Sequence, residues 1–405
     1  MTDVAIHGSC QPQFAAVADV FRENFASRGE VGAAVTLTLG GETVVDLWGG
    51  EADPETGRQW EQDTRVVVNS CTKGATALCA HILADRGLLD FEARVGTYWP
   101  EFATNGKEDA TVRMLLDHSV GLPVFTSELK PGDMYDWDRM CNLLAAQEPS
   151  WKPGTRVGYQ AVSFGWLVGE VVRRVSGRSL GTFFREEVAE PFGVEFDIGL
   201  PAELEPTVAP IISSTPKPDD DSNFFQSVMN EPNSFLATLL TNMVTAQADP
   251  RSRDWRAAEI GGGGGVATAR GVAGVYTELG QGGGKLVSAD TVARMGLISS
   301  ATAEDATFLI PTRFSLGYMK SMDNRSRMLG TSSEGMSVIV SDTAFGHVGS
   351  GGSFGFADPA EGIGFGYVMN RQGSGILLDD RGQSLIDAVY TSLGYSTHSP
   401  GVWVR

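Results

Sequence analysis

Residues 65–86 read RVVVNSCTKGATALCAHILADR: a short apolar run, a polar turn at Asn69 and Ser70, and a long apolar segment. The run that ends at Val68 is short and rich in valine, which indicates a strand. Residues 73–86 are apolar on nearly every face, and this pattern predicts a helix that is buried on all sides. The sequence therefore predicts that Ser70 lies where a strand passes into a buried helix.

Strand signals lie on both sides of this segment. Residues 31–39 and 42–48 are strand-like runs separated by Gly40-Gly41, which predicts a hairpin because glycine tolerates the positive φ of tight turns. Near the other end of the chain, three short β-rich runs are bounded by Gly or Asp-Pro: 337–340, 352–356 and 364–370. We expect one sheet with strands from both ends of the chain.

Helices are predicted at both ends and in the middle. An apolar stripe with helical spacing predicts a first helix over residues 14–25, and a similar stripe over 386–393 predicts a last one. Between the strand-rich ends, residues 157–175 and 266–275 have helical character, and the second of these segments follows a run of five glycines. This order indicates a helical domain inserted into a sheet domain.

The composition excludes several classes of function. The chain carries 31 Lys+Arg and 50 Asp+Glu, a formal net charge of −19, which disfavours binding to nucleic acid and to anionic membranes. No apolar run approaches the roughly 20 residues of a membrane span, and residues 1–13 lack the apolar stretch of a signal peptide. We therefore expect a cytoplasmic protein. Its oligomeric state is open, and a homo-oligomer stays an alternative to a monomer.

The sequence offers no evident metal or cofactor site. Its five histidines form no His-Glu-x-x-His motif, and its four cysteines form no Cys-x-x-Cys pair. Four cysteines in a chain of 405 residues indicate buried thiols rather than a disulfide framework. The glycine-rich runs contain no complete phosphate-binding motif, since Gly284-Lys285 is followed by Leu286 rather than by Ser or Thr. We expect neither a metal nor a cofactor.

Three serines are followed by a lysine three residues later: Ser70 with Lys73, Ser127 with Lys130, and Ser214 with Lys217. The last two pairs are predicted to lie in loops near prolines, where a lysine stays hydrated and protonated. Ser70 and Lys73 open the buried helix, and positions i and i+3 share one helix face.

A lysine in this position is a candidate general base. Burial and the positive end of the helix both disfavour the charged ammonium, so a neutral Lys73 could take the proton of Ser70. The alternative is an N-cap serine beside a lysine whose amine reaches solvent. The pattern by itself leaves both interpretations open.

Another candidate nucleophile is Ser353, in Gly351-Gly352-Ser353-Phe354-Gly355, which matches Gly-x-Ser-x-Gly. In α/β-hydrolases this motif connects a strand to a helix, and an acid and a histidine follow it. Here strand signals lie on both sides, and the only downstream histidine is His398. We therefore expect Ser353 to be a strand residue.

Several motifs together resemble those of the serine β-lactamase and penicillin-binding protein superfamily. Residues 68–74, Val-Asn-Ser-Cys-Thr-Lys-Gly, resemble its first motif, and Pro153-Gly154 followed by Tyr159 resembles the segment with its catalytic tyrosine. Residues 346–352, Gly-His-Val-Gly-Ser-Gly-Gly, resemble its strand motif. The similarity covers nearly the whole chain and is closest to the carboxylesterases of β-lactamase fold, called family VIII.

This resemblance implies an α/β (α+β) fold with an antiparallel sheet built from both chain ends, flanking terminal helices and an inserted all-helical domain, as in class C β-lactamases. We expect residues 1–80 and 310–405 to form the sheet domain and residues 81–309 the helical domain, with the active site in the cleft between them. The implied function is hydrolysis of short or medium acyl carboxylic esters through an acyl-enzyme.

The same resemblance implies the roles of individual residues. Ser70 is the nucleophile, Lys73 is its base, and Tyr159 relays a proton to the leaving alcohol. The backbone N–H groups of Ser70 and Ser350 form the oxyanion hole. Composition adds an apolar wall from residues 224–243. The residues expected to bind substrate are His347, Gly349, Phe125 and Gln160.

Two departures from class C β-lactamases favour neutral esters over β-lactams. Where those enzymes have Tyr-x-Asn, this chain has Tyr159-Gln160-Ala161, so the amide that would bind an acylamide is absent. Their strand motif begins with lysine, whereas His347 is mostly uncharged at neutral pH. The open alternatives are hydrolysis of β-lactams, including a weak side activity, of D-amino peptides or of small amides, acyl transfer, and a catalytically idle scaffold.

Overall fold

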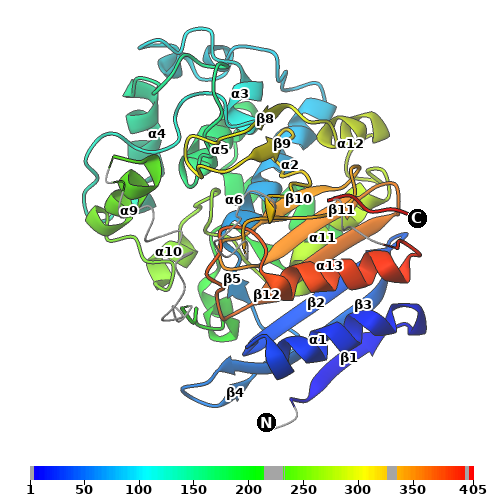
Figure 1. The fold of residues 1–405 in the computed structure, drawn as a ribbon. Helices are drawn as coiled ribbons and strands as arrows, with labels where there is room; N and C mark the ends of the chain where they lie inside the picture. Colours follow the sequence, from blue (N-terminus) through cyan, green and yellow to red (C-terminus); the bar gives the residue numbers. More distant parts are fainter. Residues whose placement is uncertain (1–3, 214–230, 232, 326–334, 397–400) are drawn as a thin grey trace.

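A computed structural model describes residues 4–213, 231, 233–325, 335–396 and 401–405 (Figure 1). In this part of the chain the main sheet has the order β1-β3-β2-β12-β11-β10, with β4 paired to β3, and every pair is antiparallel. Its strands are β1 (Ile6–Cys10), β2 (Gly32–Leu39), β3 (Glu42–Asp53), β4 (Arg58–Gln59), β10 (Phe345–Val348), β11 (Phe354–Asp358) and β12 (Ile363–Met369). The described residues also form two small sheets from β5 (Val66–Val67), β6 (Phe196–Asp197), β7 (Val266–Ala267), β8 (Ser300–Thr302) and β9 (Thr312–Phe314).

Both ends of the chain contribute strands to the main sheet, which confirms the predicted fold class. β2 pairs with β12, and Val35 lies opposite Tyr367 although the two are far apart in sequence. β2 and β3 form the predicted hairpin, in which Gly40 and Gly41 turn the chain with φ values of +57° and +84°. The edge strand β1 adds to the outer side of β3 and was not expected from the sequence.

Helices cover both faces of the main sheet. Neighbouring residues of a strand point to opposite faces. A Cβ atom added at Gly355 would lie 2.6 Å from the ring of Tyr276 in α11 (Ala269–Gly280), whereas the ring of the next residue, Phe356, stacks on that of Tyr390 in α13 (Asp380–Ser392). α11 therefore covers one face, and α13 covers the other beside α1 (Ala15–Ser27), as Figure 1 shows.

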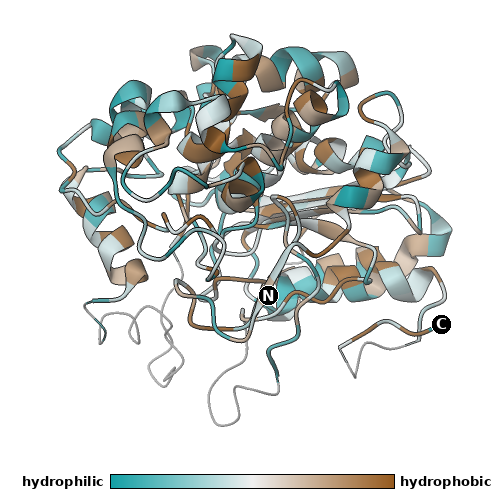
Figure 2. Cartoon of the chain, turned by 90° about the horizontal axis from the view of Figure 1, so that it is seen from above, coloured by the Kyte–Doolittle hydropathy of each residue, from teal (hydrophilic) through white to brown (hydrophobic). Residues whose placement is uncertain are grey.

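The remaining helices form a second layer beside the sheet. The most central is α2 (Thr72–Asp85), which contacts β10 on one side and α5 and α6 on another, and whose residues from Thr72 to Leu83 are all buried, as predicted. Most helices carry both apolar and hydrophilic residues (Figure 2), as helices around a core do. The others are α3 (Val112–Leu116), α4 (Trp137–Ala146), α5 (Ser163–Ser176), α6 (Leu180–Phe184), α7 (Glu190–Phe192), α9 (Phe235–Thr245), α10 (Arg253–Ala257) and α12 (Ala289–Met295).

Three expectations about single elements need correction. Residues 337–340 do not form a strand, because Ser337 and Val338 make only isolated bridges. The segment 266–275 begins as β7 and becomes helical only in α11, after Thr268 accepts a hydrogen bond as its N-cap. The helix expected over 157–175 starts later, at Ser163.

The domain boundaries at 80 and 309 stay a prediction. α11 lies within residues 81–309 and yet packs on the main sheet, so the helical segment is not confined to the second layer. The four cysteines are free, and three of them are buried. Among the described helices, none combines the length and the apolar character needed to cross a bilayer.

Candidate active site

Ser70 and Lys73 lie where the sequence predicts them, at the start of α2. The chain leaves β5, makes a single 3-10 turn over Asn69–Cys71, and continues directly into the helix. Because both residues face the same side of this turn, Lys73 Nζ lies 3.1 Å from Ser70 Oγ. This contact satisfies the distance requirement for a nucleophile and its base.

The Lys73 amine is enclosed by neutral groups. Its side chain has no exposed surface, and Nζ donates hydrogen bonds of 2.6 Å to the carbonyl oxygens of Ala161 and Gly262. Burial lowers the pKa of Lys73 well below its usual value, and the Cys71 thiol opposes this effect only weakly. A neutral amine has two N–H groups and one lone pair, so with both carbonyls satisfied the lone pair is free to accept the proton of Ser70.

The carbonyl of Gly262 reaches Lys73 because the glycine run 261–265 packs closely against α5. A Cβ atom at Gly165 would lie 2.3 Å from the nitrogen of Gly262. In addition, the Thr76 hydroxyl donates a hydrogen bond of 2.8 Å to the carbonyl oxygen of Gly261. The run is therefore packed backbone that supplies an acceptor to the site.

Tyr159 closes the other side of the Ser70–Lys73 pair. Its ring centroid is 4.7 Å from Lys73 Nζ, and the ring stacks on Phe308 at 4.3 Å. Its backbone N–H donates to Asp305 Oδ1 at 3.0 Å, and the same oxygen accepts from the N–H of Phe308, so Asp305 holds both rings in place. Burial raises the pKa of Tyr159, and the nearby Ser70 hydroxyl opposes the increase. The phenol therefore stays protonated, and its buried hydroxyl has no hydrogen-bond partner in the described chain.

Ser350 lies in the loop after β10, next to the turn that carries Ser70. Asn69 Nδ2 donates a hydrogen bond of 2.7 Å to the carbonyl oxygen of Ser350. The loop can come this close because residue 349 is a glycine: a Cβ atom there would lie 2.2 Å from the carbonyl oxygen of Val68. Gly349 therefore shapes the site through its missing side chain. The arrangement can place the N–H groups of Ser70 and Ser350 on one side of the nucleophile.

His347 and Gln160 are fully buried in the wall of the site. The His347 ring lies 6.0 Å from that of Tyr159, and its Nδ1 is 2.8 Å from the carbonyl oxygen of Val348, which favours the tautomer with Nδ1 as donor. Burial lowers the pKa of His347 well below its usual value, and Lys73 lowers it further. The Gln160 side chain turns away to His118, with Oε1 2.8 Å from Nδ1.

A cavity of about 220 Å³ opens beside Ser70 and is mainly apolar. α9 contributes one face with the spacing i, i+3, i+4, i+7: Leu236, Leu239, Leu240 and Met243. The lining that the structure describes includes no Lys, Arg, Asp or Glu side chain. The other lining residues are Asn69, Tyr159, Ala161, Val162, Pro250, Trp255, Gly262, Gly263, Phe308, Met319, Val348, Ser350 and Ile376.

The expected apolar wall is thus found in α9, whereas residues 224–230 and 232 lie outside the described residues. Phe125 packs in the core rather than on the cavity surface. Its ring lies edge-on to Trp166 with centroids 5.6 Å apart, and its carbonyl accepts a hydrogen bond of 2.8 Å from Asn242 of α9. Phe125 therefore supports α9 from behind and does not line the cavity.

The other candidate serines are placed differently. Ser127 and Lys130 are both exposed, as expected for a loop, and Ser214 with Lys217 lies outside the described residues. Ser353 is buried just before β11, and its carbonyl accepts hydrogen bonds from the Gly349 N–H and the Cys71 thiol. In the described part of the chain, no group of three or more His, Cys, Asp or Glu is arranged to hold a metal ion.

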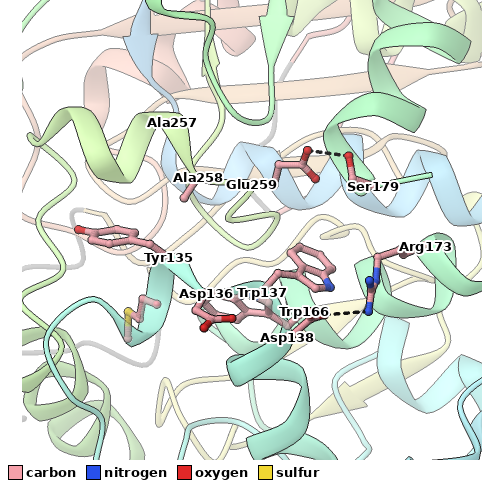
Figure 3. Close-up of a pocket in the computed structure, with 11 residues that line it drawn as sticks. Tyr135, Asp136, Trp137, Asp138, Trp166, Arg173, Ser179, Ala257, Ala258 and Glu259 are labelled. Carbon is pink, nitrogen blue, oxygen red and sulfur yellow. Dashed lines mark hydrogen bonds and ion pairs between the residues drawn. The ribbon is translucent and has the colours of Figure 1, made fainter. Parts of the chain in front are cut away.

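A larger cavity of about 630 Å³ lies between the start of α4, α5 and the end of α10 (Figure 3). Four of its polar side chains are paired within the protein: Arg173 donates to Asp138 at 3.0 Å, and the Ser179 hydroxyl donates to Glu259 at 2.7 Å. Ser179 also caps α6 by accepting from the Thr182 N–H. These residues hold the helices together. The cavity beside Ser70, although smaller, is the one with a candidate nucleophile next to a candidate base.

Several residues of the site have no signal in the sequence. The carbonyls of Ala161 and Gly262 reach Lys73, and the carboxylate of Asp305 reaches the backbone of Tyr159, through long-range packing. Asn69 carried a weak signal, because asparagine tolerates positive φ better than most residues do. Its φ is +46°.

Comparison with known proteins agrees with this geometry. The sequence model of the Beta-lactamase family matches residues 17–388. "Esterase/beta-lactamase LipL" of Mycobacterium tuberculosis (strain ATCC 25618 / H37Rv) is 34% identical over 387 residues, which cover 93% of this chain and 85% of LipL. A crystal structure of a family VIII carboxylesterase superposes with a TM-score of 0.81 at 39% identity, covering 96% of this chain and all of that one. A penicillin-binding protein homolog from Caulobacter crescentus also has a TM-score of 0.81, at 34% identity and with coverage of 96% and 100%.

Proposed function

The chain belongs to the β-lactamase family, and from that premise we propose that it is a carboxylesterase that cleaves neutral esters with short or medium apolar acyl groups. The acyl group would be carried on Ser70. LipL is named for both esterase and β-lactamase activity, so the family alone supports hydrolysis without selecting the bond. The choice between ester and β-lactam rests on the chemistry of the cavity.

The observation that carries the proposal is the apolar lining of the Ser70 cavity, which includes no charged side chain among the residues that the structure describes. A substrate carboxylate would need a cationic partner, because removing an unpaired charge from water is costly. His347 does not provide one, since burial keeps it neutral, and the Gln160 side chain is turned away to His118. A neutral acyl chain against α9 needs no such partner, and its burial is favourable.

Acylation follows from the positions of Ser70 and Lys73. Ser70 Oγ attacks the ester carbonyl carbon while its proton passes to Lys73 Nζ, which is 3.1 Å away. The carbonyl oxygen becomes an oxyanion and is stabilised by the N–H groups of Ser70 and Ser350. Collapse of the tetrahedral intermediate breaks the bond to the alcohol oxygen.

Tyr159 is suited to protonate that leaving oxygen. Burial raises its pKa, so the phenol carries a proton at neutral pH and donates it to the alkoxide, while the Lys73 ammonium replaces the proton on Tyr159. Water then attacks the acyl-enzyme. The raised pKa of Tyr159 makes the neutral Lys73 amine the better base for this second step.

The proposal is tested by measuring turnover of p-nitrophenyl butanoate and of nitrocefin, together with covalent labelling by a fluorophosphonate. We expect ester turnover to exceed nitrocefin turnover, and Ser70→Ala to lose both ester turnover and labelling. Ser353→Ala is the matched control, because Ser353 lies in the Gly-x-Ser-x-Gly motif but not on the cavity surface. This control should label like the wild type.

Two results would overturn the proposal. Rapid turnover of nitrocefin without turnover of the ester would reject the substrate class. Equal labelling of wild type and Ser70→Ala would reject the nucleophile.

A further inference from the structure

Asn69, the residue before the nucleophile, has an unusual conformation and an unusual contact. Its φ is +46°, in the left-handed region that non-glycine residues enter at a cost. Its side chain leaves the turn and donates through Nδ2 to the carbonyl oxygen of Ser350 at 2.7 Å. Its own carbonyl accepts a hydrogen bond from the Thr72 hydroxyl, which anchors the turn on α2. Asn69 therefore connects the start of α2 to the loop after β10.

The loop that receives this hydrogen bond has a permissive backbone. Ser350 is exposed, and the two residues that follow it, Gly351 and Gly352, have φ values of +93° and +119°. On the buried side, the Cys71 thiol contacts the carbonyls of His347 and Ser353, but thiols are weak donors. The hydrogen bond from the Asn69 amide is thus stronger than those from the Cys71 thiol, and it connects the turn that carries Ser70 to the middle of this loop.

We propose that Asn69 is a positioning residue for the oxyanion hole, holding the Ser350 backbone against the turn that carries Ser70. This inference rests on the proposed function, since it takes the N–H groups of Ser70 and Ser350 as the oxyanion donors. Asn69 acts through Ser350 and not as a reacting group. The strained φ of Asn69 aims its side chain at the loop.

Two substitutions separate the hydrogen bond from the backbone conformation. Asn69→Gly keeps the left-handed φ accessible and removes the donor. Asn69→Asp keeps the size of the side chain and replaces the donor with a carboxylate oxygen, which repels the Ser350 carbonyl. We expect both variants to lower kcat by about 10- to 100-fold on p-nitrophenyl butanoate with little change in KM, because the donors are misplaced only for the oxyanion.

The chain contains a matched control for the loss of such a bond. Asn105 also has a positive φ, +55°, and its Nδ2 donates to the carbonyl oxygen of Ala146 at 2.7 Å; neither residue lines the Ser70 cavity. Asn105→Gly should lower the unfolding midpoint about as much as Asn69→Gly does, and it should leave kcat unchanged. Comparing the two variants separates an effect on catalysis from the loss of stability that follows when any asparagine side-chain hydrogen bond is removed.

An alkyl boronic acid provides the second measurement. It forms a tetrahedral adduct on serine and places an oxygen in the oxyanion hole, so its affinity follows stabilisation of the transition state. Affinity for the boronic acid should fall in Asn69→Gly by the same factor as kcat/KM. If Asn69 contacted substrate directly, KM would rise and boronic acid affinity would fall no more than substrate affinity.

The inference is wrong if Asn69→Gly keeps kcat within about twofold of wild type, or if Asn69→Asp is fully active while Asn69→Gly is not. Its failure differs from failure of the proposed function. If only this inference fails, wild type still hydrolyses the ester and is labelled at Ser70. If the proposed function fails, wild type does not hydrolyse the ester, or it is labelled no more than Ser70→Ala.

Discussion

At the scale of single residues, the proposed mechanism depends on the protonation state of Lys73. Burial lowers its pKa well below the usual 10.5, and the amine is the active base only when it is neutral. The rate kcat/KM should therefore rise with pH as Lys73 loses its proton and should reach a plateau well below pH 10.5. Steady-state kinetics from acid to alkaline pH measure this profile. A rate that does not vary with pH would contradict a lysine base.

Lys73→Met tests the same assignment by substitution. Methionine has nearly the shape of lysine and no proton acceptor of comparable strength, so we expect kcat to fall by about 10²- to 10⁴-fold. Lys107→Met is the matched control: Lys107 is also buried and donates to two backbone carbonyls, those of Thr104 and Gln147, but it lies away from Ser70. It should lose stability and keep its rate. Equal loss of rate in both variants would point to a structural effect.

The sequence predicted the local geometry of the candidate site, whose catalytic roles stay a prediction. Ser70 and Lys73 are three residues apart on one helix, so the spacing alone brings them together. The contact between Asn69 and Ser350 and that between Tyr159 and Asp305 join distant segments, and no local pattern encodes them. The orientation of the Gln160 side chain could not be predicted from the sequence either, because it depends on where His118 lies in the fold.

At the scale of elements, we expect α9 to select the acyl group, because four of its side chains line the cavity. Leu240 lies on the face of α9 that lines the cavity and is only partly buried, so a larger side chain there fills space without entering the core. We expect Leu240→Trp to lower kcat/KM for p-nitrophenyl hexanoate by at least about tenfold and to spare the acetate, because a filled pocket excludes the longer chain. Rates across an acyl series measure the effect.

Val244→Trp is the control for this change. Val244 is on the same helix, is 77% exposed and is not on the cavity surface. It should leave the chain-length preference unchanged. If Leu240→Trp also leaves it unchanged, the acyl group binds elsewhere.

The errors in element prediction have physical causes. β1 reads Ile-His-Gly-Ser-Cys, with polar residues at its centre, and it is a strand because β3 offers a free edge to pair with. Residues 338–340 are apolar and buried, but within 337–340 only Ser337 and Val338 make bridges, each an isolated one. Residues 157–162 are mostly apolar and buried as well, and Tyr159 there is held by Asp305 before α5 begins. In these two segments, buried irregular chain has the same apolar sequence pattern as a strand or a helix, so the pattern misled the prediction.

At the scale of the whole molecule, the two ends of the chain meet in a buried ionic cluster. Glu30 follows α1, and its carboxylate accepts hydrogen bonds from Arg381 at 2.9 Å and from the Tyr367 hydroxyl. Arg381 in the first turn of α13 also pairs with Asp379 at 2.7 Å. The cluster thus connects the first helix, the strand β12 and the last helix. The ion pairs therefore link the N-terminal and C-terminal segments, which the main sheet also links through backbone hydrogen bonds.

This arrangement predicts that Arg381→Met is strongly destabilised, by about 3–5 kcal/mol at pH 7–8, because Glu30 must either stay as an unpaired buried charge or bind a proton from solution. Burial already raises the pKa of Glu30 above 4.5, and Arg381 opposes this rise. Without Arg381 the pKa rises further, so the native variant keeps a proton that the unfolded chain releases. The deficit relative to wild type should therefore widen as pH increases from 5 to 8, as urea unfolding at several pH values can measure.

Adding Glu30→Gln to Arg381→Met removes the stranded charge and should recover much of the stability at pH 8 but little at pH 5. Arg22→Met is the surface control, since its partner Asp19 is exposed and such pairs contribute at most about 1 kcal/mol. A deficit in Arg381→Met that is independent of pH would mean that lost packing, and not the charge of Glu30, accounts for its instability. A stability difference between Arg381→Met and wild type that grows with pH is expected only if the buried Glu30 carboxylate is stabilised by Arg381, which lies near the other end of the chain.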